Sequence, residues 1–384
     1  MSAWRTGLTA ELADPSRRSL LRGITALGAS TLLPAVSSWA RVTTAVNTPH
    51  AIDCHHHFAS KAYLKALTAK QGHRVPGYSS QLTWVGQGPT RTGWRDYLPA
   101  RDSEESGQQG IACSLLSCTT PGVWFGDAEE TRRLTRDMND FGAKAVADYK
   151  GRFGLFAVLP LPLIEDSLRE IEYALDTLKA DGVGILSSYG NHWLGDPAFQ
   201  PVFDELNRRK AVVFVHATDA PCCQDLFPDL GAAGVEWNFD TARTIFSLLS
   251  TGAATRYANI RFIFSHGGGA LISLLQRFGI GDADTIADVL ARPAETDSRL
   301  YHLRRFYYDT ANATNPVEMQ GLKMAVGTSQ ILFGTDRLPD EHGSADGPGK
   351  SVIGLQKCGL NPQELRDIFR GNAERLFPRL RATA

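Results

Sequence analysis

The stretch AIDCHHHF (residues 51–58) joins the pattern of a β-strand to three consecutive histidines, and the fold can be worked out from it. Successive side chains of a strand point to opposite faces. The pattern therefore predicts that His55 and His57 share one side of the strand while His56 faces the other. Imidazoles are costly to bury without partners. The rest of the chain must supply the groups that explain this pair.

Similar short apolar runs recur along the chain and alternate with longer amphipathic segments. After 51–58, the predicted strands cover residues 111–117, 153–161, 182–188, 211–218, 260–267, 305–311 and 330–336. Helical patterns between them cover residues 128–149, 165–180, 197–210, 241–257 and 316–326. Near-continuous apolar strands that alternate with helices are typical of a parallel sheet covered on its outer face. Eight such units predict an α/β fold, a (β/α)8 TIM-like barrel over residues 48–384.

The longest connection in this predicted barrel covers residues 71–105 and is rich in Gly, Pro, Trp and Arg. It forms a long loop insertion after the first strand and helix, so it could fold over the mouth of the barrel. The sequence contains no internal repeat and no low-complexity linker. We therefore expect one barrel domain rather than several smaller ones.

Polar residues gather at the predicted carboxyl ends of the strands, where barrel enzymes place their catalytic groups. His55 and His57 end the first strand, His216 the fifth, His266 the sixth and Asp336 the eighth. One strand-end histidine in an apolar run is more often a hydrogen-bonded core residue, but five polar residues on one face indicate a shared role. Imidazoles and a carboxylate from four strand ends can hold one divalent ion and leave a position open.

Several neighbouring residues have structural interpretations instead. His56 faces the helical shell, and Asp53 is expected to orient the strand rather than to bind a metal. Cys54, Cys113 and Cys118 lie in or beside apolar runs and are expected to be buried free thiols.

Composition excludes two classes of partner. The chain has 384 residues, 43% of them hydrophobic, and a formal net charge of −1. Such a balance gives no electrostatic footprint for nucleic acid or for an anionic membrane, so we expect neither. Six cysteines in a chain of this length do not form a dense disulfide framework.

The N-terminal residues 1–40 have a different character from the barrel. Arg17 and Arg18 precede a weakly apolar run that ends in the small-residue pattern Ser38-Trp39-Ala40. This pattern is typical of a twin-arginine export signal, which predicts a periplasmic or secreted protein. The alternative is a basic, disordered N-terminal tail. The run is too short to remain as a membrane anchor.

The motifs DCHHH, VFVHATD, FSHGGGALISLLQR, FGTD and the late GNAERLF resemble the amidohydrolase superfamily, and within it the aminocarboxymuconate-semialdehyde decarboxylase-like group. The resemblance runs from about residue 50 to the C-terminus. The segments LPLP, EIEYALDTLKADGVGILSSYGNHWLGDP and ELNRRKAVVFVH look most like bacterial 6-methylsalicylate decarboxylase-type proteins.

This resemblance implies a metal site and a base. His55, His57, His216 and Asp336 would bind a single divalent ion, Zn²⁺ first and Mn²⁺ second. His266 would be the general base that hydrogen-bonds a metal-bound water. Binuclear members use a carboxylated lysine on the fourth strand, but GVGILSS (residues 182–188) contains no lysine. A single-metal site follows.

The resemblance also implies a second subunit. In decarboxylases of this group an arginine eleven residues after the sixth-strand histidine reaches into the neighbouring site, and Arg277 has that spacing. It would anchor a substrate carboxylate and imply a homodimer. The alternative is a solvated helix arginine.

Two departures from the family pattern alter the expected pocket. His216 is followed by Ala217 where the family commonly has proline, and Arg337 follows Asp336 where an aromatic residue is common. The arginine expected in the first barrel loop is not cleanly placed, and Arg91 and Arg95 are its candidates.

The predicted function is metal-dependent nonoxidative decarboxylation of a small aromatic carboxylic acid, a hydroxybenzoate of the 6-methylsalicylate type. A metal could hold the phenolate and carboxylate together while Asp336 carries a proton to the ring carbon. Trp193 could stack on the ring and His192 could contact a substrate hydroxyl.

Two other functions stay open at this point. A hydrolase could use the same metal to attack a lactone or amide, and an exported binding protein could hold the metal or the aromatic acid without turnover. Release of CO₂ from the substrate distinguishes the first function from both.

Overall fold

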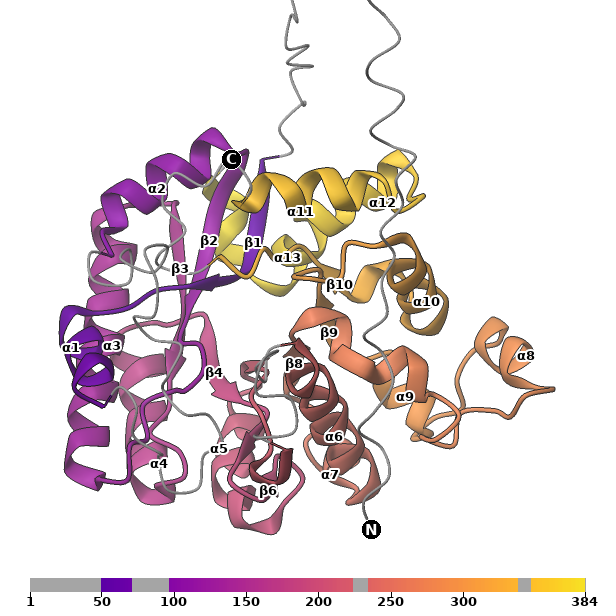
Figure 1. Cartoon of the computed structure of the whole chain (residues 1–384), viewed down its shortest axis with the longest axis horizontal. Coiled ribbons are helices and arrows are strands. Elements are labelled where there is room, and N and C mark those ends of the chain that lie inside the picture. Colours follow the sequence, from indigo (N-terminus) through magenta and orange to yellow (C-terminus); the bar gives the residue numbers. More distant parts are fainter. Residues whose placement is uncertain (1–49, 71–96, 224–233, 338–346, 384) are drawn as a thin grey trace, which may run out of the picture. The chain divides into compact units, whose positions relative to one another are not determined.

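The computed structural model describes residues 50–70, 97–223, 234–337 and 347–383. All eight predicted strands are present and form one parallel sheet in the order β1-β2-β3-β4-β7-β8-β9-β10 (Figure 1). The strands are β1 (Ala51–His57), β2 (Ile111–Ser117), β3 (Phe153–Val158), β4 (Gly182–Leu186), β7 (Val212–His216), β8 (Arg261–Phe264), β9 (Tyr307–Asp309) and β10 (Ile331–Leu332). A small antiparallel hairpin joins β5 (Ser188–Tyr189) to β6 (His192–Trp193).

The sheet closes on itself between its first strand and the segment that follows its last one. Cys54 N donates to Phe333 O at 2.8 Å and Asp336 N donates to His55 O at 2.9 Å. His57 N donates to Arg337 O, also at 2.9 Å. These bonds give a nearly closed (β/α)8 barrel, as the sequence predicted. They also bring two histidines of β1 against the aspartate from the other end of the chain.

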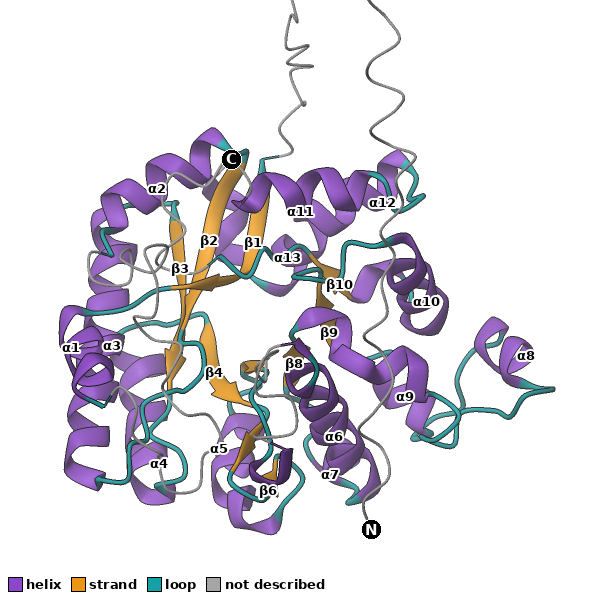
Figure 2. Cartoon of the chain, viewed as in Figure 1, coloured by secondary structure: helices purple, strands orange, loops and turns teal. Residues whose placement is uncertain are grey.

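Helices surround the strands, as Figure 2 shows. They are α1 (Lys61–Ala69), α2 (Pro99–Gln108), α3 (Ala128–Asp148), α4 (Ile164–Glu172), α5 (Gln200–Arg208), α6 (Glu236–Ser250), α7 (Ala253–Arg256), α8 (Ile286–Ala291), α9 (Arg299–Leu303), α10 (Pro316–Val326), α11 (Gly347–Gln356), α12 (Pro362–Arg366) and α13 (Asn372–Leu376). In α3, Leu134 and Met138 are fully buried one turn apart, and Asp127 caps the first turn by accepting from Glu130 N.

The structure corrects several predicted boundaries. The strands predicted over 305–311 and 330–336 shrink to three and two residues, so Asp336 lies in the turn beyond β10. The helix predicted over 241–257 begins at Glu236 and is interrupted at Gly252, which has a positive φ. The last part of the connection predicted over 71–105 is not loop, because Pro99 begins α2. Residues 71–96 lie outside the described chain, and so do residues 1–49 with the predicted signal.

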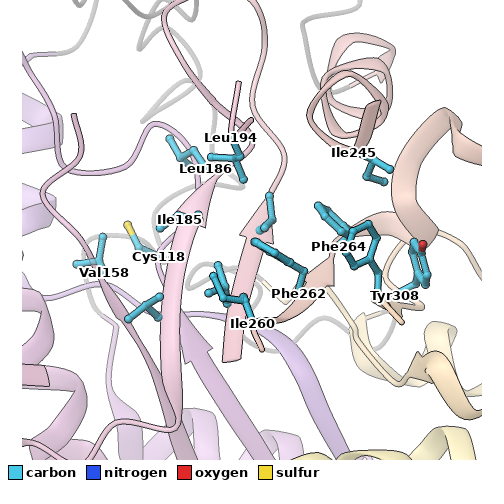
Figure 3. Close-up of a cluster of buried hydrophobic side chains, with 14 of the residues drawn as sticks. Cys118, Val158, Ile185, Leu186, Leu194, Ile245, Ile260, Phe262, Phe264 and Tyr308 are labelled. Atoms are coloured by element: carbon cyan, nitrogen blue, oxygen red, sulfur yellow. The ribbon is translucent and has the colours of Figure 1, made fainter. Parts of the chain in front are cut away.

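Buried apolar side chains fill the space between strands and helices. Figure 3 shows part of this core, in which Phe262, Phe264 and Tyr308 pack together on neighbouring strands. A second buried cluster includes Ile52, Cys54, Phe156 and Phe214 and is covered by Phe377 and Leu380 of the C-terminal segment.

The described cysteines are free, and those of β1 and β2 are buried as expected. In the part of the chain with described structure, no helix is both long and apolar enough to cross a membrane.

Strand β1 is irregular where the histidines begin. Its pairing register with β2 shifts between Asp53 and His56. Cys54 packs in the same buried cluster as Phe214, and the ring of the next residue, His55, also lies 5.0 Å from the Phe214 ring. Irregular strand pairing re-aims side chains next to active sites. Here it lets His55 and His57 point to the barrel interior while His56 points outward.

Candidate metal centre

Four histidine side chains from three strand ends meet around the carboxylate of Asp336, which follows a fourth strand, β10. Its Oδ1 lies 3.0 Å from Nε2 of His55 and 3.0 Å from Nε2 of His57, and 3.9 Å from Nε2 of His216. Its Oδ2 lies 3.2 Å from Nε2 of His266. The four histidines are almost completely buried. The structure therefore brings together every residue predicted for metal binding and for the general base.

The two oxygens of Asp336 have different surroundings. Oδ1 faces the nitrogens of His55, His57 and His216, whereas Oδ2 accepts a hydrogen bond from Asn312 Nδ2 at 2.8 Å and faces His266. His266, Asn312 and Asp336 all have positive φ, at 56°, 53° and 58°. Positive φ is uncommon outside glycine and is concentrated at functional sites. The three residues that meet at Oδ2 of Asp336 therefore all have this unusual backbone conformation.

Two glycines allow the segments to approach this closely. A Cβ at Gly334 would lie 2.8 Å from His55 Cβ and 3.0 Å from Asp309 Cβ. A Cβ at Gly269, which has a φ of +64°, would lie 2.2 Å from the carbonyl oxygen of Asn238. The first glycine lets the FGTD turn reach β1, and the second lets the SHGGG turn pack against the start of α6.

Asp309, at the end of β9, holds two members of the site. Its Oδ2 lies 2.8 Å from Nδ1 of His55, and its Oδ1 accepts from the backbone N–H of His266 at 3.0 Å. A carboxylate bonded to the far nitrogen of a ligand histidine fixes the tautomer and the ring orientation. Sequence reasoning missed Asp309, although it stands at the end of a predicted strand.

An aromatic side chain that sequence reasoning also missed lies against two of these histidines. The ring of Trp237, in the first turn of α6, is stacked with the His266 ring at 6.5 Å and 14°. It also meets the His216 ring edge-on at 5.7 Å. Trp237 therefore borders the site on the side of β7 and β8.

The five side chains differ in charge. Burial lowers the pKa of His216 to about 3 and lowers the pKa of His57 as well, so both are neutral near pH 7. Burial also lowers the pKa of His55, but the carboxylates of Asp309 and Asp336 outweigh it and raise the pKa to about 10. Burial raises the pKa of Asp336, yet the charge of His55 leaves it well below its usual range. The centre therefore places the neutral imidazoles of His57 and His216 and the protonated imidazole of His55 beside an anionic carboxylate.

This donor set fits a divalent cation. Nε2 of His55 and Nε2 of His57 point at each other across 3.1 Å. The two carboxylates around His55 favour positive charge at this position, and a proton on the imidazole or a bound cation would supply it. Among the described residues, donor atoms of His55, His216, His266 and Asp336 lie within 4.8 Å of one another. Imidazole and carboxylate donors suit zinc and manganese.

The residues predicted to bind substrate do not join this group. His192 is exposed on β6, and its Nδ1 lies 2.8 Å from Asp196 Oδ2. Trp193 donates its indole N–H to Asp240 Oδ1 at 2.8 Å. Arg277 is exposed in the turns after β8. Arg91 and Arg95 lie outside the described residues.

Asp240 connects Trp193 indirectly to the metal centre. It accepts hydrogen bonds from the hydroxyls of Ser187 and Ser188, and Ser187 N donates to the carbonyl of His216. Trp193 therefore supports the wall behind His216 rather than facing the five donors.

The two residues that depart from the family pattern have different positions. Ala217 is fully buried, and its carbonyl lies 2.7 Å from Nδ1 of His216, so it orients that ring. Arg337 was expected to alter the pocket beside Asp336, but it points to α2 and pairs with Asp102 and Glu105.

Comparisons with known proteins find relatives that match most of the chain. The 6-methylsalicylic acid decarboxylase of Penicillium expansum is 32% identical over 342 residues, which cover 86% of this chain and 97% of that protein. Decarboxylase macB of Penicillium terrestre is 31% identical over 351 residues, which cover 86% of this chain and 95% of that protein.

A solved structure has the same fold. The dihydroxybenzoic acid decarboxylase of Polaromonas sp. JS666, crystallised with manganese and the inhibitor 2-nitroresorcinol, superposes with a TM-score of 0.69 at 20% identity. The match covers 85% of this chain and 96% of that one.

The family model described as Amidohydrolase matches residues 52–379, which confirms the resemblance seen in the motifs. With most of its length matched in this way, the chain belongs to the amidohydrolase family.

Proposed function

We propose that this protein is a metal-dependent nonoxidative decarboxylase of a small aromatic carboxylic acid, of the hydroxybenzoate or 6-methylsalicylate type. The observation that carries the proposal is the convergence of four imidazoles on the two oxygens of Asp336. The relatives named as 6-methylsalicylic acid decarboxylases, aligned over most of this chain, support the substrate class.

The proposed ligands are His55, His57, His216 and Asp336, with one Zn²⁺ as the preferred ion and Mn²⁺ as the second choice. Metal-binding imidazoles must be unprotonated, and burial favours that state for His57 and His216. At His55, a bound cation would replace the proton that Asp309 and Asp336 favour. A divalent cation bound there would supply a Lewis acid that stabilises negative charge on the substrate.

His266 and Asp336 are the proposed proton-handling pair. As CO₂ leaves, the ring carbon that carried it must gain a proton. His266 Nε2 lies 3.2 Å from Asp336 Oδ2, so a proton can pass between these two atoms. Asn312 bonds the same oxygen and keeps it turned away from the nitrogens of His55 and His57. This arrangement leaves one oxygen of Asp336 for ligation and one for proton transfer.

The substrate ring is proposed to lie against Trp237, whose indole borders His266 and His216. Arg277 is proposed to bind the substrate carboxylate in the site of a second subunit, which makes the protein a homodimer. Its exposure in the single chain supports this role, and the exposed Phe239 and Phe246 of α6 supply apolar surface for an interface.

Export is proposed on sequence grounds. Arg17 and Arg18, followed by an apolar run and the pattern ending at Ala40, support a twin-arginine signal over residues 1–40. The mature protein would then act in the periplasm or outside the cell. Fusion of residues 1–40 to a reporter, with and without an R17K/R18K change, tests this proposal.

The decisive experiment is metal analysis of the purified protein, followed by a CO₂-release screen over substituted salicylates. With 6-methylsalicylate we expect stoichiometric CO₂ and 3-methylphenol from the wild type and release slower by about 10² to 10⁴ from the H266N variant. Acid release from lactones or amides without CO₂ would establish the hydrolase instead. Binding of metal and aromatic acid with no product of either kind would establish a binding protein and refute the enzyme.

A further inference from the structure

A buried polar network covers the outer side of the junction where β1 meets the turn after β10. We call it the seam network, and its members are Asp53, His56, Tyr97, Asp102, Glu105, Thr335 and Arg337. It joins three parts of the chain: β1, the FGTDR turn and α2, whose places in the fold can be followed in Figure 1. None of its members is one of the five donors described above.

Arg337 is the cation at one end of this network. Its side chain is only 2% exposed although it carries a permanent charge. Nε lies 3.1 Å from Asp102 Oδ1 and Nη2 lies 2.6 Å from Glu105 Oε2. The guanidinium therefore ties the residue directly after Asp336 to two successive turns of α2.

Asp102 continues the network to β1. Its Oδ2 lies 2.8 Å from Nε2 of His56 and accepts from the Tyr97 hydroxyl at 3.0 Å. The other ring nitrogen of His56 lies 3.1 Å from Asp53 Oδ2. The outward-facing histidine of the HHH run is thus held between two carboxylates.

Asp53 connects the network to Thr335, the residue directly before Asp336. Its Oδ2 accepts from the Thr335 hydroxyl at 2.6 Å, and its Oδ1 accepts from Thr335 N at 3.1 Å. The same Oδ1 accepts from the backbone N–H of His55 at 3.0 Å. Both neighbours of Asp336 are therefore anchored, on one side through Thr335 and on the other through Arg337.

Stability alone does not account for such a network. A buried ion pair costs desolvation, and well-packed apolar residues in its place are often as stable or more so. Charged, directional contacts do fix geometry, however. Asp336 has a φ of +58°, a conformation that a short free turn would not hold uniquely.

We infer that Arg337 and Asp102 are positioning residues for the metal centre. They hold Asp336 in its left-handed conformation and keep the FGTDR turn in register with the His55–His57 pair. The inference rests on the metal site proposed above and adds residues that touch neither metal nor substrate. Loss of either side chain should let Asp336 move relative to the histidines and weaken metal binding while the barrel still folds.

The test compares R337M, R337K and D102N with the wild type by titration of the metal-free proteins with Zn²⁺ and Mn²⁺. We expect R337M and D102N to weaken binding by about 10- to 100-fold, the range for residues that orient ligands. R337K should restore part of the affinity, because it keeps the charge. The visible spectrum of the Co²⁺-loaded proteins should change in R337M and D102N, since it reports the ligand geometry.

R136M is the control for loss of an arginine–carboxylate pair elsewhere in the barrel. Arg136 pairs with the buried Glu170 at 2.8 Å between α3 and α4, away from the seam network. We expect R136M to lower the unfolding temperature of the metal-free protein without changing metal affinity. If it weakens metal binding as much as R337M does, general destabilisation explains the effect and the inference is wrong.

The remaining outcomes distinguish failure of the positioning role from failure of the metal site itself. Wild-type affinity and Co²⁺ spectrum in R337M and D102N would overturn the positioning role while leaving the metal site intact. Failure of the wild type to bind either metal would instead overturn the proposed site. If R337M does not fold, D102N and R337K carry the test, since D102N keeps the shape of the side chain.

Discussion

His266 and Asp336 face each other with 3.2 Å between Nε2 and Oδ2, and the backbone of both residues is left-handed. Their hydrogen-bonding partners differ. The backbone N–H of His266 is held by Asp309, whereas Oδ2 of Asp336 is also held by Asn312. The pair is therefore fixed from β9 and the turn that follows it. This separates it from His57 and His216, which reach only the other oxygen of Asp336.

Replacing His266 by asparagine tests whether it is a base or a ligand. We expect kcat to fall by about 10² to 10⁴, the usual contribution of a general acid or base, with metal content unchanged. Steady-state kinetics and metal analysis of the same preparation measure both quantities. H57N is the matched change on the opposite oxygen of Asp336, and it should lose metal. Loss of metal from H266N would show that His266 is a ligand.

Asp309 should matter through His55 and His266 rather than through the substrate. D309A removes the acceptor for His55 Nδ1 and for His266 N, so we expect metal affinity to fall by about 10- to 100-fold. D309N keeps an acceptor oxygen and should lose less. Metal titration of both variants checks the order. Equal affinity in D309A and the wild type would refute the role of Asp309.

Trp237 should affect substrate binding more than chemistry. An aromatic pair contributes about 0.5–1.5 kcal/mol beyond buried area, so W237L should raise KM by about two- to tenfold. W237F keeps a ring and should stay near the wild type. Initial rates over a range of substrate concentration separate KM from kcat. A fall in kcat alone, with KM unchanged, would place the substrate elsewhere.

Removal of the metal should reduce both activity and stability. A ligand present at 100 times its Kd stabilises the folded state by about 2.7 kcal/mol. A chelator should therefore lower the unfolding temperature and abolish CO₂ release. Adding Zn²⁺ or Mn²⁺ separately should restore both to different extents, which identifies the preferred ion. Full activity after complete metal removal would contradict the proposed chemistry.

His56 gives a pH dependence that can be measured without substrate. Burial lowers its pKa, but Asp102 and Asp53 outweigh burial and raise it from 6.5 to about 9 in the folded state. The protonated form is thus favoured by folding. Its contribution to stability is complete below pH 6.5 and is lost as the pH rises through about 9.

Urea unfolding of metal-free protein across this pH range measures the loss. The H56Q variant should show a flatter decline than the wild type, because it cannot gain or lose this proton. Parallel curves for the two proteins would show that His56 does not carry the effect.

The sequence allowed the donors to be predicted because each of them ends or closely follows an apolar strand. VVFVH and RFIFSH place His216 and His266 unambiguously, and the barrel rule then brings them to one face. The alternation argument for His55 and His57 was also correct. The alternation holds only within the histidine run, however. The register shift in β1 changes which side chains face the barrel interior just before that run.

The missed residues depend on tertiary approach rather than on local pattern. Trp237 lies in a helix whose start is brought to His266 by the contact of Gly269 with Asn238. Asp309 and Asn312 are single polar residues around a three-residue strand, with no motif around them. His192 and Trp193 were predicted to face the substrate, but a two-residue hairpin turns His192 outward. A loop sequence does not specify such directions.

Strand β1 serves the protein on both sides, with His55 and His57 inside the barrel and Asp53 and His56 in the seam network. A library that randomises this strand would therefore yield mostly inactive clones. New acid preferences are better sought at Trp237, which borders His216 and His266. The barrel could then accept a different ring while strand β1 stays untouched.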